Sequence, residues 1–559
     1  MMKVLIIGGS TGGISAAARL RCLDESAQII VLERDAYVSY ANSALPYYIG
    51  GEITQKSALL IHTPESLKRQ LNLDVRIKHE AIRLYLHENK AAIRDLSTGT
   101  LYLESYDKLI LSPGATPIRP DLPGFDDPRV FTLRNIPDAY KMEKFMKEVH
   151  PKHAVVIGAD YLGLTMAENL AKAGLSITII ETVGHALGSL DSDMAAIARY
   201  DLQAKKSIKL LSGHSVRSIL PMENGLLVQL DQENLPADLV FLSLGIRPNG
   251  DIAERSGLGT SPRGAILVDQ YLRTSDPAVY AVGDAVEFGQ NQDISTGGSF
   301  LESADKQGYV AASNIAGLRQ QYKGAQATSL IRVLNLAVGT VGWTEKTAKQ
   351  VQLSYDKVYV RVLSHAEYYP GSIPIDIKVL FERETGLILG AQLIGVDGVD
   401  KWLAIFSMAV QQRMLAKDFA ALELGYTPPF SSEPNSAHSV GCIIDDLVKK
   451  RIYQYHWEQV PDLLQKNHVF VDVRMPAEYI SGHIDGAVNV PLDTLRARLN
   501  EFNKDVPLYL YCQDGHRSYL AARILMGHGF SVRYLSGGYR LYAAAALHLF
   551  SFFGCSGYQ

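Results

Sequence analysis

One cysteine of the chain stands in a segment that could hold a reactive sulfur. Residues 512–518 read Cys-Gln-Asp-Gly-His-Arg-Ser, after the apolar run Leu-Tyr-Leu-Tyr and before a helical stretch. Backbone N–H groups at such a strand-to-helix turn bind an anion. They would lower the pKa of the Cys512 thiol and stabilise a persulfide on it. Arg517 adds positive charge and Ser518 a hydrogen-bond donor, so we expect a catalytic cysteine rather than a buried structural one.

The N-terminal residues 4–18 have the pattern of a dinucleotide-binding βαβ unit. An apolar strand leads into a glycine turn and then into a helix of small residues. Gly8 permits the tight turn, and Gly13 lets helix and strand approach closely, while the free N–H groups of the helix hold a pyrophosphate. The next strand ends in Glu33, an acid suited to an adenosine ribose. Ser10 stands where the middle glycine of the fingerprint is usual.

The loop that follows carries a family resemblance. Residues 37–51 read Tyr-Val-Ser-Tyr-Ala-Asn-Ser-Ala-Leu-Pro-Tyr-Tyr-Ile-Gly-Gly. With the glycine turn before it, this stretch resembles coenzyme A-disulfide reductases and the related NADH-dependent persulfide reductases. These are FAD enzymes of the pyridine nucleotide-disulfide oxidoreductase class, and their loop carries one redox cysteine between a serine and an asparagine. Ser39 and Asn42 match the flanking positions and are expected to bind substrate; Ser43 stands at the cysteine position.

Ser43 changes the chemistry that this loop can perform. A thiolate can attack a disulfide, and a flavin can reduce the adduct, whereas a serine hydroxyl has no accessible redox chemistry. Two explanations are open: an engineered substitution that traps a complex, or natural loss of thiol chemistry. Ala44 replaces the family's usual glycine and favours the second. By resemblance, Arg19 in the first helix would meet the phosphates of coenzyme A; the alternative is a solvated helix face.

A second nucleotide unit covers residues 154–165, with its glycines at Gly158 and Gly163. Its position predicts the NAD(P)H-binding domain, and Glu181 at the end of the next strand favours NADH because a carboxylate repels a 2′-phosphate. Asp160 occupies the middle position of this fingerprint. A carboxylate about 4 Å from one phosphate charge costs roughly 4 kcal/mol at an effective dielectric of 20. Rotation of the side chain or an inserted cation would relieve part of that cost.

Residues 277–285, Pro-Ala-Val-Tyr-Ala-Val-Gly-Asp-Ala, resemble the second FAD signature of the class. The resemblance implies that Asp284 accepts hydrogen bonds from the ribityl chain of FAD; the alternative is a strand followed by an Asp-capped helix. Residues 106–117 contain a Pro-Gly turn and resemble the crossover from the FAD domain to the NAD domain.

Residues 325–439 resemble the dimerisation domain of the class. In the family, tyrosines from two segments of this domain reach into the active site of the other subunit. The matching positions are Tyr368, in His-Ala-Glu-Tyr-Tyr-Pro-Gly, and Tyr426, in Leu-Gly-Tyr-Thr-Pro-Pro. The alternative role is that of an anchor in the dimer interface.

The C-terminal part of the chain resembles rhodaneses. The resemblance rests on residues 469–491 and on the loop that begins at Cys512. It implies sulfur transfer rather than phosphate chemistry at Cys512. Glu478 and His483 are expected to be structural.

Composition excludes several classes of function. A net charge of −4 gives no nucleic-acid footprint. No run of about 18 apolar residues is present, so we expect no membrane span. A strand begins directly after Met1-Met2-Lys3, which leaves no room for a signal peptide. The four cysteines lack zinc-ligand spacing, so we expect no metal and a reducing cytoplasm.

We therefore predict an α/β chain with two Rossmann-like domains for FAD and NAD(P), an α+β dimerisation domain and a C-terminal α/β rhodanese domain. A length of 559 residues suits such an organisation. The expected boundaries are 1–115 and 251–322 for FAD, 116–250 for NAD(P)H, 323–440 for dimerisation, 441–459 for a linker and 460–559 for the rhodanese domain.

Three functional hypotheses follow. The first is an FAD-dependent NAD(P)H oxidoreductase that acts on a small disulfide or persulfide, works as a homodimer and uses Cys512 as a sulfurtransferase thiol; coenzyme A is a possible further ligand. The second is a dimeric sulfurtransferase whose reductase half is silent. The third is an NADH oxidase or diaphorase.

Overall fold

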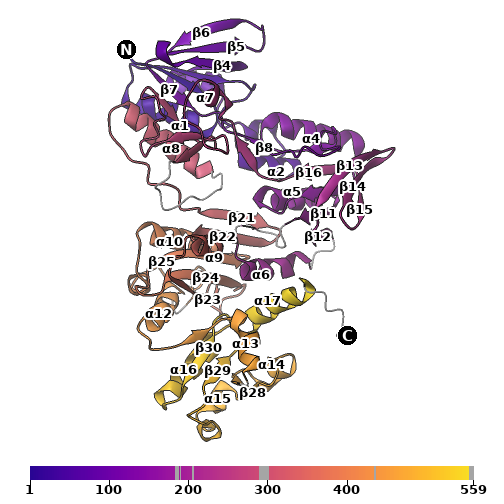
Figure 1. Cartoon of the computed structure of the whole chain (residues 1–559), viewed down its shortest axis with the longest axis vertical. Coiled ribbons are helices and arrows are strands. Elements are labelled where there is room, and N and C mark those ends of the chain that lie inside the picture. The colour runs from indigo at the N-terminus through magenta and orange to yellow at the C-terminus, as the bar shows by residue number, and fades with distance from the viewer. Residues whose placement is uncertain are drawn as a thin grey trace. The chain divides into compact units, whose positions relative to one another are not determined.

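A computed structural model of the chain describes residues 1–182, 188, 190–203, 207–288, 301–432, 436–466 and 468–552 (Figure 1). Cys555 lies outside the described residues. The chain forms two compact units. The first consists of Met1–Gly184 and Ser207–Ala327, and the second of His185–Lys206 and Thr328–Gln559.

The first unit begins with a five-stranded parallel sheet. Its central strand is buried on both faces, with Val4, Leu5 and Ile6 at 0% exposure, because helices cover a parallel sheet on both sides. The last strand comes from a distant part of the sequence. In spatial order the strands are β19 (Val279–Ala281), β7 (Lys108–Leu111), β1 (Lys3–Ile7), β2 (Gln28–Glu33) and β3 (Asp74–Ile77).

Helices α1 (Thr11–Leu23) and α8 (Leu301–Ile315) pack closely against each other beside this sheet. A Cβ at Gly308 would lie 2.4 Å from the carbonyl oxygen of Gly12, so a glycine is required where the two helices meet. The elements around the sheet are η1 (Asn42–Ala44), α2 (Leu45–Ile49), η2 (Lys56–Leu59), α3 (Pro64–Leu71), β4 (His79–Tyr85), η3 (Leu86–Glu88), β5 (Lys90–Asp95), β6 (Leu101–Ser105), α7 (Asp251–Arg255), β18 (Ile266–Val268) and β20 (Val286–Phe288).

A second five-stranded parallel sheet in the same unit repeats this construction. Its strands, in spatial order, are β12 (Ile208–Ser212), β11 (Ser176–Glu181), β10 (His153–Ile157), β16 (Leu239–Leu242) and β9 (Val130–Phe131). The remaining elements are α4 (Ile136–Val149), α5 (Tyr161–Lys172), the antiparallel strands β13 (Val216–Met222), β14 (Gly225–Leu230) and β15 (Asn234–Ala237), and the pair β8 (Ala115–Pro117) and β17 (Ile246–Pro248).

The second unit contains an antiparallel five-stranded sheet and a parallel five-stranded sheet. The antiparallel sheet is formed by β21 (Ser329–Val333), β22 (Leu336–Gly342), β25 (Ile388–Gly395), β24 (Pro374–Glu382) and β23 (Tyr355–Leu363). Helices α6 (Ser192–Gln203), α9 (Glu345–Gln350), α10 (Val399–Gln411), α11 (Ala416–Ala420) and α12 (Ser436–Val448) accompany it.

The parallel sheet of the second unit consists of β26 (Gln454–Tyr455), β30 (Val532–Leu535), β29 (Leu508–Tyr511), β27 (Val469–Asp472) and β28 (Val488–Asn489). Its helices are η4 (Trp457–Gln459), α13 (Val460–Gln465), α14 (Pro476–Ile480), α15 (Leu492–Leu495), η5 (Leu499–Glu501), α16 (His516–Gly527) and α17 (Gly538–Phe552). The segment 441–459, which we expected to be a helical linker, is α-helical only to Val448 and has a 3₁₀ turn at Trp457–Gln459. Gln454 and Tyr455 pair with β30 and already belong to the sheet.

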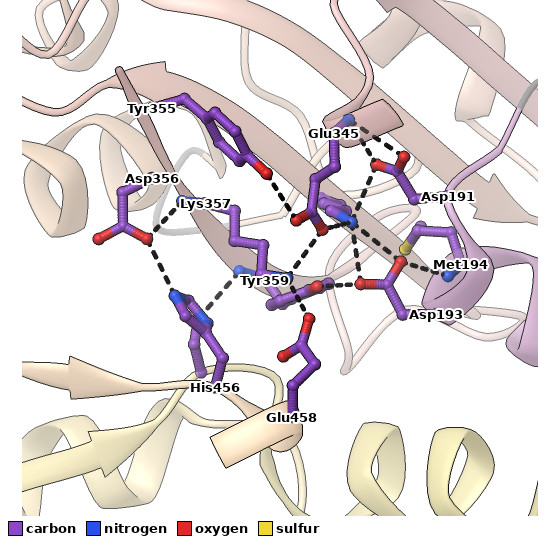
Figure 2. A network of polar contacts seen from close by, with 12 residues as sticks. Asp191, Asp193, Met194, Glu345, Tyr355, Asp356, Lys357, Tyr359, His456 and Glu458 are labelled. Atoms are coloured by element: carbon purple, nitrogen blue, oxygen red, sulfur yellow. Dashed lines mark hydrogen bonds and ion pairs between the residues drawn. The ribbon is translucent and has the colours of Figure 1, made fainter. Parts of the chain in front are cut away.

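A buried network of charges lies within the second unit (Figure 2). The Lys378 side chain is 0% exposed, and its Nζ lies 2.9 Å from Asp191 Oδ2, 2.9 Å from Asp193 Oδ2 and 2.5 Å from Glu345 Oε1. Lys357 Nζ also contacts Glu345, at 2.7 Å. Burial alone would lower the pKa of Lys378, but the three carboxylates outweigh it and the pKa is raised. The segment that begins α6 is thus joined to the antiparallel sheet.

Ion pairs also join the two sheets of the second unit. In each contact one partner lies on β23 or β24, and the other lies shortly after β26 or β30 of the parallel sheet. The ion pairs are Lys357–Glu458 at 2.5 Å and Asp376–Arg540 at 2.6 Å, and a hydrogen bond joins His456 Nε2 and Asp356 Oδ1 at 2.9 Å.

In the described part of the chain, no helix combines the length and the apolar character needed to cross a membrane.

Candidate functional site

The first glycine turn requires glycine for steric reasons. Gly8 has φ +106°, and a Cβ there would lie 2.0 Å from the carbonyl oxygen of Ser112. A Cβ at Gly13 would lie 1.9 Å from the carbonyl oxygen of Gly8. The turn, the start of α1 and the end of β7 therefore approach one another as closely as backbone allows.

The N-terminus of α1 keeps its amide donors available. Ser10 is the N-cap residue, and its side chain makes no capping hydrogen bond. Glu33 Oε2 accepts a hydrogen bond from Gly9 N at 2.9 Å, and its Oε1 accepts one from Asp35 N at 2.9 Å. Burial raises the pKa of Glu33. These residues fit the adenosine and pyrophosphate part of FAD, because the ribose acid is fixed beside an uncapped helix N-terminus.

Asp284 lies directly after Gly283, which has φ +84°. Its carboxylate forms an ion pair with the guanidinium of Arg134. Gln307 on α8 fixes the same turn, because its Oε1 accepts a hydrogen bond from Gly283 N at 2.6 Å. The two FAD signatures, far apart in sequence, thus lie on strands β1 and β19 of one sheet, on either side of β7.

The loop with the expected redox position is attached to the first glycine turn. Ser39, with φ +46°, donates its backbone N–H to the carbonyl oxygen of Gly9 at 2.9 Å. Asn42 is half-buried and Ser43 is exposed in the 3₁₀ turn η1. The structure thus places a hydroxyl, not a thiol, on the loop that the glycine turn holds.

Arg19 is engaged with α8. Its guanidinium carbon lies 4.1 Å from the centre of the Tyr309 ring, and its Nε donates to Ser313 Oγ at 3.2 Å. Arg21 is buried and donates to four backbone carbonyl groups. Arg21 is therefore structural, and a phosphate-binding role for Arg19 stays a prediction.

The second glycine turn has the same close backbone contacts and the same glutamate-to-amide hydrogen bond as the first. Gly158 has φ +101°, and its Cβ would lie 1.9 Å from the carbonyl oxygen of Ser243; a Cβ at Gly163 would lie 2.1 Å from that of Gly158. Glu181 Oε2 accepts a hydrogen bond from Ala159 N at 2.8 Å. The ribose end of this unit therefore fits a dinucleotide.

The pyrophosphate end of the second unit does not fit in the same way. Asp160 is the N-cap residue of α5, and its Oδ1 accepts hydrogen bonds from Gly163 N at 2.9 Å and from Ser243 Oγ. Burial and the neighbouring Glu181 carboxylate raise the pKa of Asp160. The chain's own carboxylate thus takes an amide donor that a pyrophosphate would use.

The two tyrosines expected to act together lie together. Tyr368 follows β23 and Tyr426 follows α11, and their hydroxyl oxygens are 2.6 Å apart. Tyr368 is 75% exposed and Tyr426 is 41% exposed. They form an exposed hydroxyl pair on the second unit.

Cys512 lies at the end of β29, where Gly515, with φ +103°, caps α16. The Cys512 side chain is fully buried. Its Sγ accepts a hydrogen bond from Gly515 N at 3.1 Å, and Ser518 Oγ is 3.5 Å away. The thiol is 3.6 Å from Asp514 Oδ1, to which its S–H points as donor. The predicted cradle of an amide and a hydroxyl around the sulfur is thus present.

Three family models match successive parts of the chain. The family model described as pyridine nucleotide-disulphide oxidoreductase matches residues 2–308, and its dimerisation domain matches residues 329–438. A rhodanese-like domain matches residues 456–545.

The chain belongs to the pyridine nucleotide-disulphide oxidoreductase family.

Two solved structures are similar over nearly the whole chain. Reduced CoADR-RHD from Bacillus anthracis has 37% identity and a TM-score of 0.94, covering 98% of each chain. An NAD-dependent persulfide reductase from A. fulgidus has 30% identity and a TM-score of 0.88, covering 97% of this chain and 100% of that one. Among curated relatives, an NADH oxidase of Methanocaldococcus jannaschii is 32% identical over 77% of this chain and 96% of its own length. A coenzyme A disulfide reductase of Staphylococcus aureus is 30% identical over 79% of this chain and 99% of its own length.

These matches confirm the predicted fold class, and they confirm that the chain is an oxidoreductase with a C-terminal rhodanese domain. The family uses FAD and NAD(H). The chain also carries the dimerisation domain of the family.

The lowered pKa that the strand-to-helix turn predicted for the Cys512 thiol was wrong. Burial raises the pKa of Cys512, and so does the Asp514 carboxylate, while Ser518 and backbone amides of the loop lower it only in part. The sequence shows the donors but not that the sulfur is fully enclosed, so the cost of burying a thiolate was missed.

Arg517 directs its guanidinium at a carboxylate. Its Nη1 and Nη2 bond the two oxygens of Glu478 at 2.7 Å and 2.6 Å. Glu478, expected to be structural, therefore neutralises the charge that we expected Arg517 to supply to the sulfur.

Sequence analysis missed a buried arginine beside the Cys512 loop. Arg474, 2% exposed, pairs with Asp472 at 2.7 Å, and its Nη1 donates to Gln513 Oε1 at 2.9 Å. It therefore fixes the residue next to Cys512. The sequence signal was the pattern Asp-Val-Arg after an apolar strand.

Ser243, the partner of Asp160, was missed as well. Its signal was an internal repeat: Leu-Ser-Leu-Gly at 242–245 matches Leu-Ser-Pro-Gly at 111–114, and each begins on the last residue of a parallel strand.

Proposed function

We propose that the chain reduces sulfane sulfur with NADH and carries that sulfur as a persulfide on Cys512. Two electrons and a proton from NADH, with one further proton, cleave the S–S bond of a persulfide. The products are a thiol, hydrogen sulfide and NAD⁺. The observation that carries the proposal is the Cys512 cradle, in which Gly515 N donates to Sγ at 3.1 Å, in a chain of this family whose redox position is Ser43.

The other described cysteines have different surroundings. Cys22 is exposed on α1. Cys442 on α12 lies 3.5 Å from His438 Nε2. Neither is at a strand-to-helix turn, whereas Cys512 is. We therefore assign the sulfur-carrying thiol to Cys512, with Ser518 as donor and Arg517 shaping the loop.

The substrate is proposed to be a small disulfide or persulfide. The relatives named for coenzyme A disulfide and for persulfide support this class. Ser39, Asn42 and Arg19 would bind it, and the two tyrosine hydroxyls would reach it from the other subunit of a dimer. Coenzyme A is a candidate carrier because its phosphates suit an arginine.

We also propose that the protein acts as a homodimer in the cytoplasm. The dimerisation domain supports the first statement. The chemistry of a free thiol supports the second, because a reducing compartment keeps Cys512 from forming disulfides.

The decisive experiment is anaerobic. The purified chain is examined for bound flavin by its visible spectrum, NADH is added, and release of hydrogen sulfide from a small persulfide is followed. We expect the flavin band to bleach and sulfide to appear. Cys512→Ser should abolish sulfide release, whereas Cys442→Ser, which also removes one thiol, should leave it intact. Unchanged turnover in Cys512→Ser would refute the proposal.

A second candidate function rests on Asp160. Because its carboxylate caps α5 at the pyrophosphate position, the reductase half would be silent and the protein would act as a sulfurtransferase. Flavin that does not bleach with NADH, together with intact thiosulfate sulfurtransfer, would favour this candidate. Oxygen consumption with NADH and no sulfide release would instead favour an oxidase.

A further inference from the structure

The first unit contains two glycine turns, so the turn of the predicted NADH site can be compared with the turn of the predicted FAD site. Its two glycine turns are built alike, and corresponding groups make corresponding contacts. The correspondences are Gly8 with Gly158, Gly13 with Gly163, Ser112 with Ser243, and Glu33 on Gly9 N at 2.9 Å with Glu181 on Ala159 N at 2.8 Å.

The turns differ at the residue that caps the helix. Ser10 makes no side-chain capping bond, so the amides at the start of α1 remain available. Asp160, at the equivalent position, accepts from Gly163 N at 2.9 Å and from Ser243 Oγ. One turn therefore presents an open anion site, and the other has the same site filled by a carboxylate of the chain.

We propose that Asp160 is an internal competitor of the dinucleotide pyrophosphate, and that NADH binds only when this carboxylate leaves the α5 N-terminus or takes up a proton. The inference rests on the proposed function in so far as NADH is the reductant. It goes beyond the proposed function in two respects. It assigns control of the affinity for NADH to one residue, Asp160, and it predicts that this affinity depends on pH.

The surroundings of Asp160 explain why the proton matters. The Glu181 carboxylate, from the end of β11, acts on it unfavourably, while Ser243 follows β16 and the amides come from α5. A pyrophosphate would add negative charge at the same place. Desolvation of the carboxyl and the charge of Glu181 raise the pKa of Asp160 and outweigh the hydrogen bonds from Ser243 and Gly163 N, which lower it; the neutral acid does not repel the ligand.

A definite pH dependence follows. If NADH binding takes up one proton at Asp160, the dissociation constant for NADH rises by at most about tenfold for each pH unit above the pKa of Asp160. Below that pKa the dependence disappears. The direction is therefore tighter binding in mild acid.

The test measures NADH binding directly, by equilibrium titration of NADH fluorescence from pH 5.5 to 8.5 with the full flavin-loaded chain. Asp160→Ser copies Ser10 and removes both charge and cap. Asp160→Asn keeps the cap but removes the charge. Asp251→Ser, which removes an exposed acid of α7 in the same unit, is the matched control. Flavin content and thiosulfate sulfurtransfer report whether each variant is folded.

We expect Asp160→Ser to bind NADH about tenfold or more tightly than the parent at pH 8, and to lose the pH dependence. Asp160→Asn should also lose the pH dependence, with a smaller gain in affinity. Equal affinities and equal pH profiles in the parent and in folded Asp160→Ser would overturn the inference. Failure of the proposed function looks different: NADH would bind with this pH profile, but no sulfide would be released.

Discussion

Replacement of Lys378 by methionine tests the buried network of the second unit. The lysine is 0% exposed and is the shared partner of Asp191, Asp193 and Glu345. Methionine has a similar volume but no charge, so three buried carboxylates would lose their common cation. Breaking a buried pair in this way costs about 3–5 kcal/mol, because the remaining charges stay desolvated without compensation.

The expected change in thermal stability is large. For a unit of the size of the second unit, each kcal/mol of lost stability lowers Tm by about 2–4 °C. A loss of about 3–5 kcal/mol therefore lowers Tm by roughly 6–20 °C. The assay is thermal unfolding at neutral pH, followed by far-UV circular dichroism and by loss of sulfurtransfer.

Lys349→Met is the matched control. Lys349 contacts the same Glu345 at 3.5 Å, but its side chain is 68% exposed. An exposed pair is worth under about 1 kcal/mol, so Tm should fall by no more than a few degrees. Equal Tm values for the two variants would refute the reasoning.

The same network predicts how the difference in Tm between the parent and Lys378→Met depends on pH. Burial would raise the pKa values of Asp193 and Glu345, but Lys378 and Lys357 outweigh it and lower both. A carboxyl with a lowered pKa in the folded state stabilises at neutral pH, and this stabilisation is lost as the pH falls through the folded pKa. In Lys378→Met both carboxyls lose this cation, although Glu345 keeps its contact with Lys357, so the pKa values of Asp193 and Glu345 should rise. The gap in Tm between parent and variant should therefore narrow in acid.

Three further predictions concern the flavin turn and the Cys512 loop. Gly13→Ala places a Cβ 1.9 Å from a carbonyl oxygen, so this variant should contain no bound flavin, as measured by flavin absorbance per chain. The control Gly527→Ala, whose Cβ meets nothing within 4 Å, should retain its flavin. Asp514→Asn removes an acid that raises the pKa of Cys512, so the midpoint pH of Cys512 alkylation should move to lower pH; an unmoved midpoint would assign the shift to burial alone. Glu478→Gln frees the Arg517 guanidinium to act on the sulfur and should speed alkylation of Cys512 at pH 7; a rate equal to that of the parent would show that the charge does not reach the sulfur.

The parallel sheets were predictable because their signals are local. An apolar run, a glycine turn and a terminal acid lie within about thirty residues, and each has one steric or electrostatic reason. The same holds for the strand, loop and helix around Cys512. The joining of β19 to β7 could be proposed only from the resemblance, because nothing local in residues 279–281 specifies a partner about 170 residues earlier.

Other features depended on contacts that a linear pattern does not contain. The pairing of β26 with β30, the buried lysine between three acids and the ion pair of Arg517 with Glu478 all join residues distant in sequence. From sequence alone a charged residue is predicted to lie on the solvated surface, because most charged residues do, and only the fold shows which of them are buried.

The sequence by itself determined the order of domains, the two dinucleotide turns, the family and the position of the thiol that we propose to carry sulfur, because spacing and residue type are properties of the chain. Only the tertiary structure showed that Cys512 is buried beside Asp514, which raises its pKa, and that Asp160 caps α5. Whether a group is charged depends on its burial and on the neighbours that folding brings to it. Cys512 carries the expected donors but is enclosed beside Asp514, and Asp160 bonds the amide donor that its sequence position assigned to a ligand.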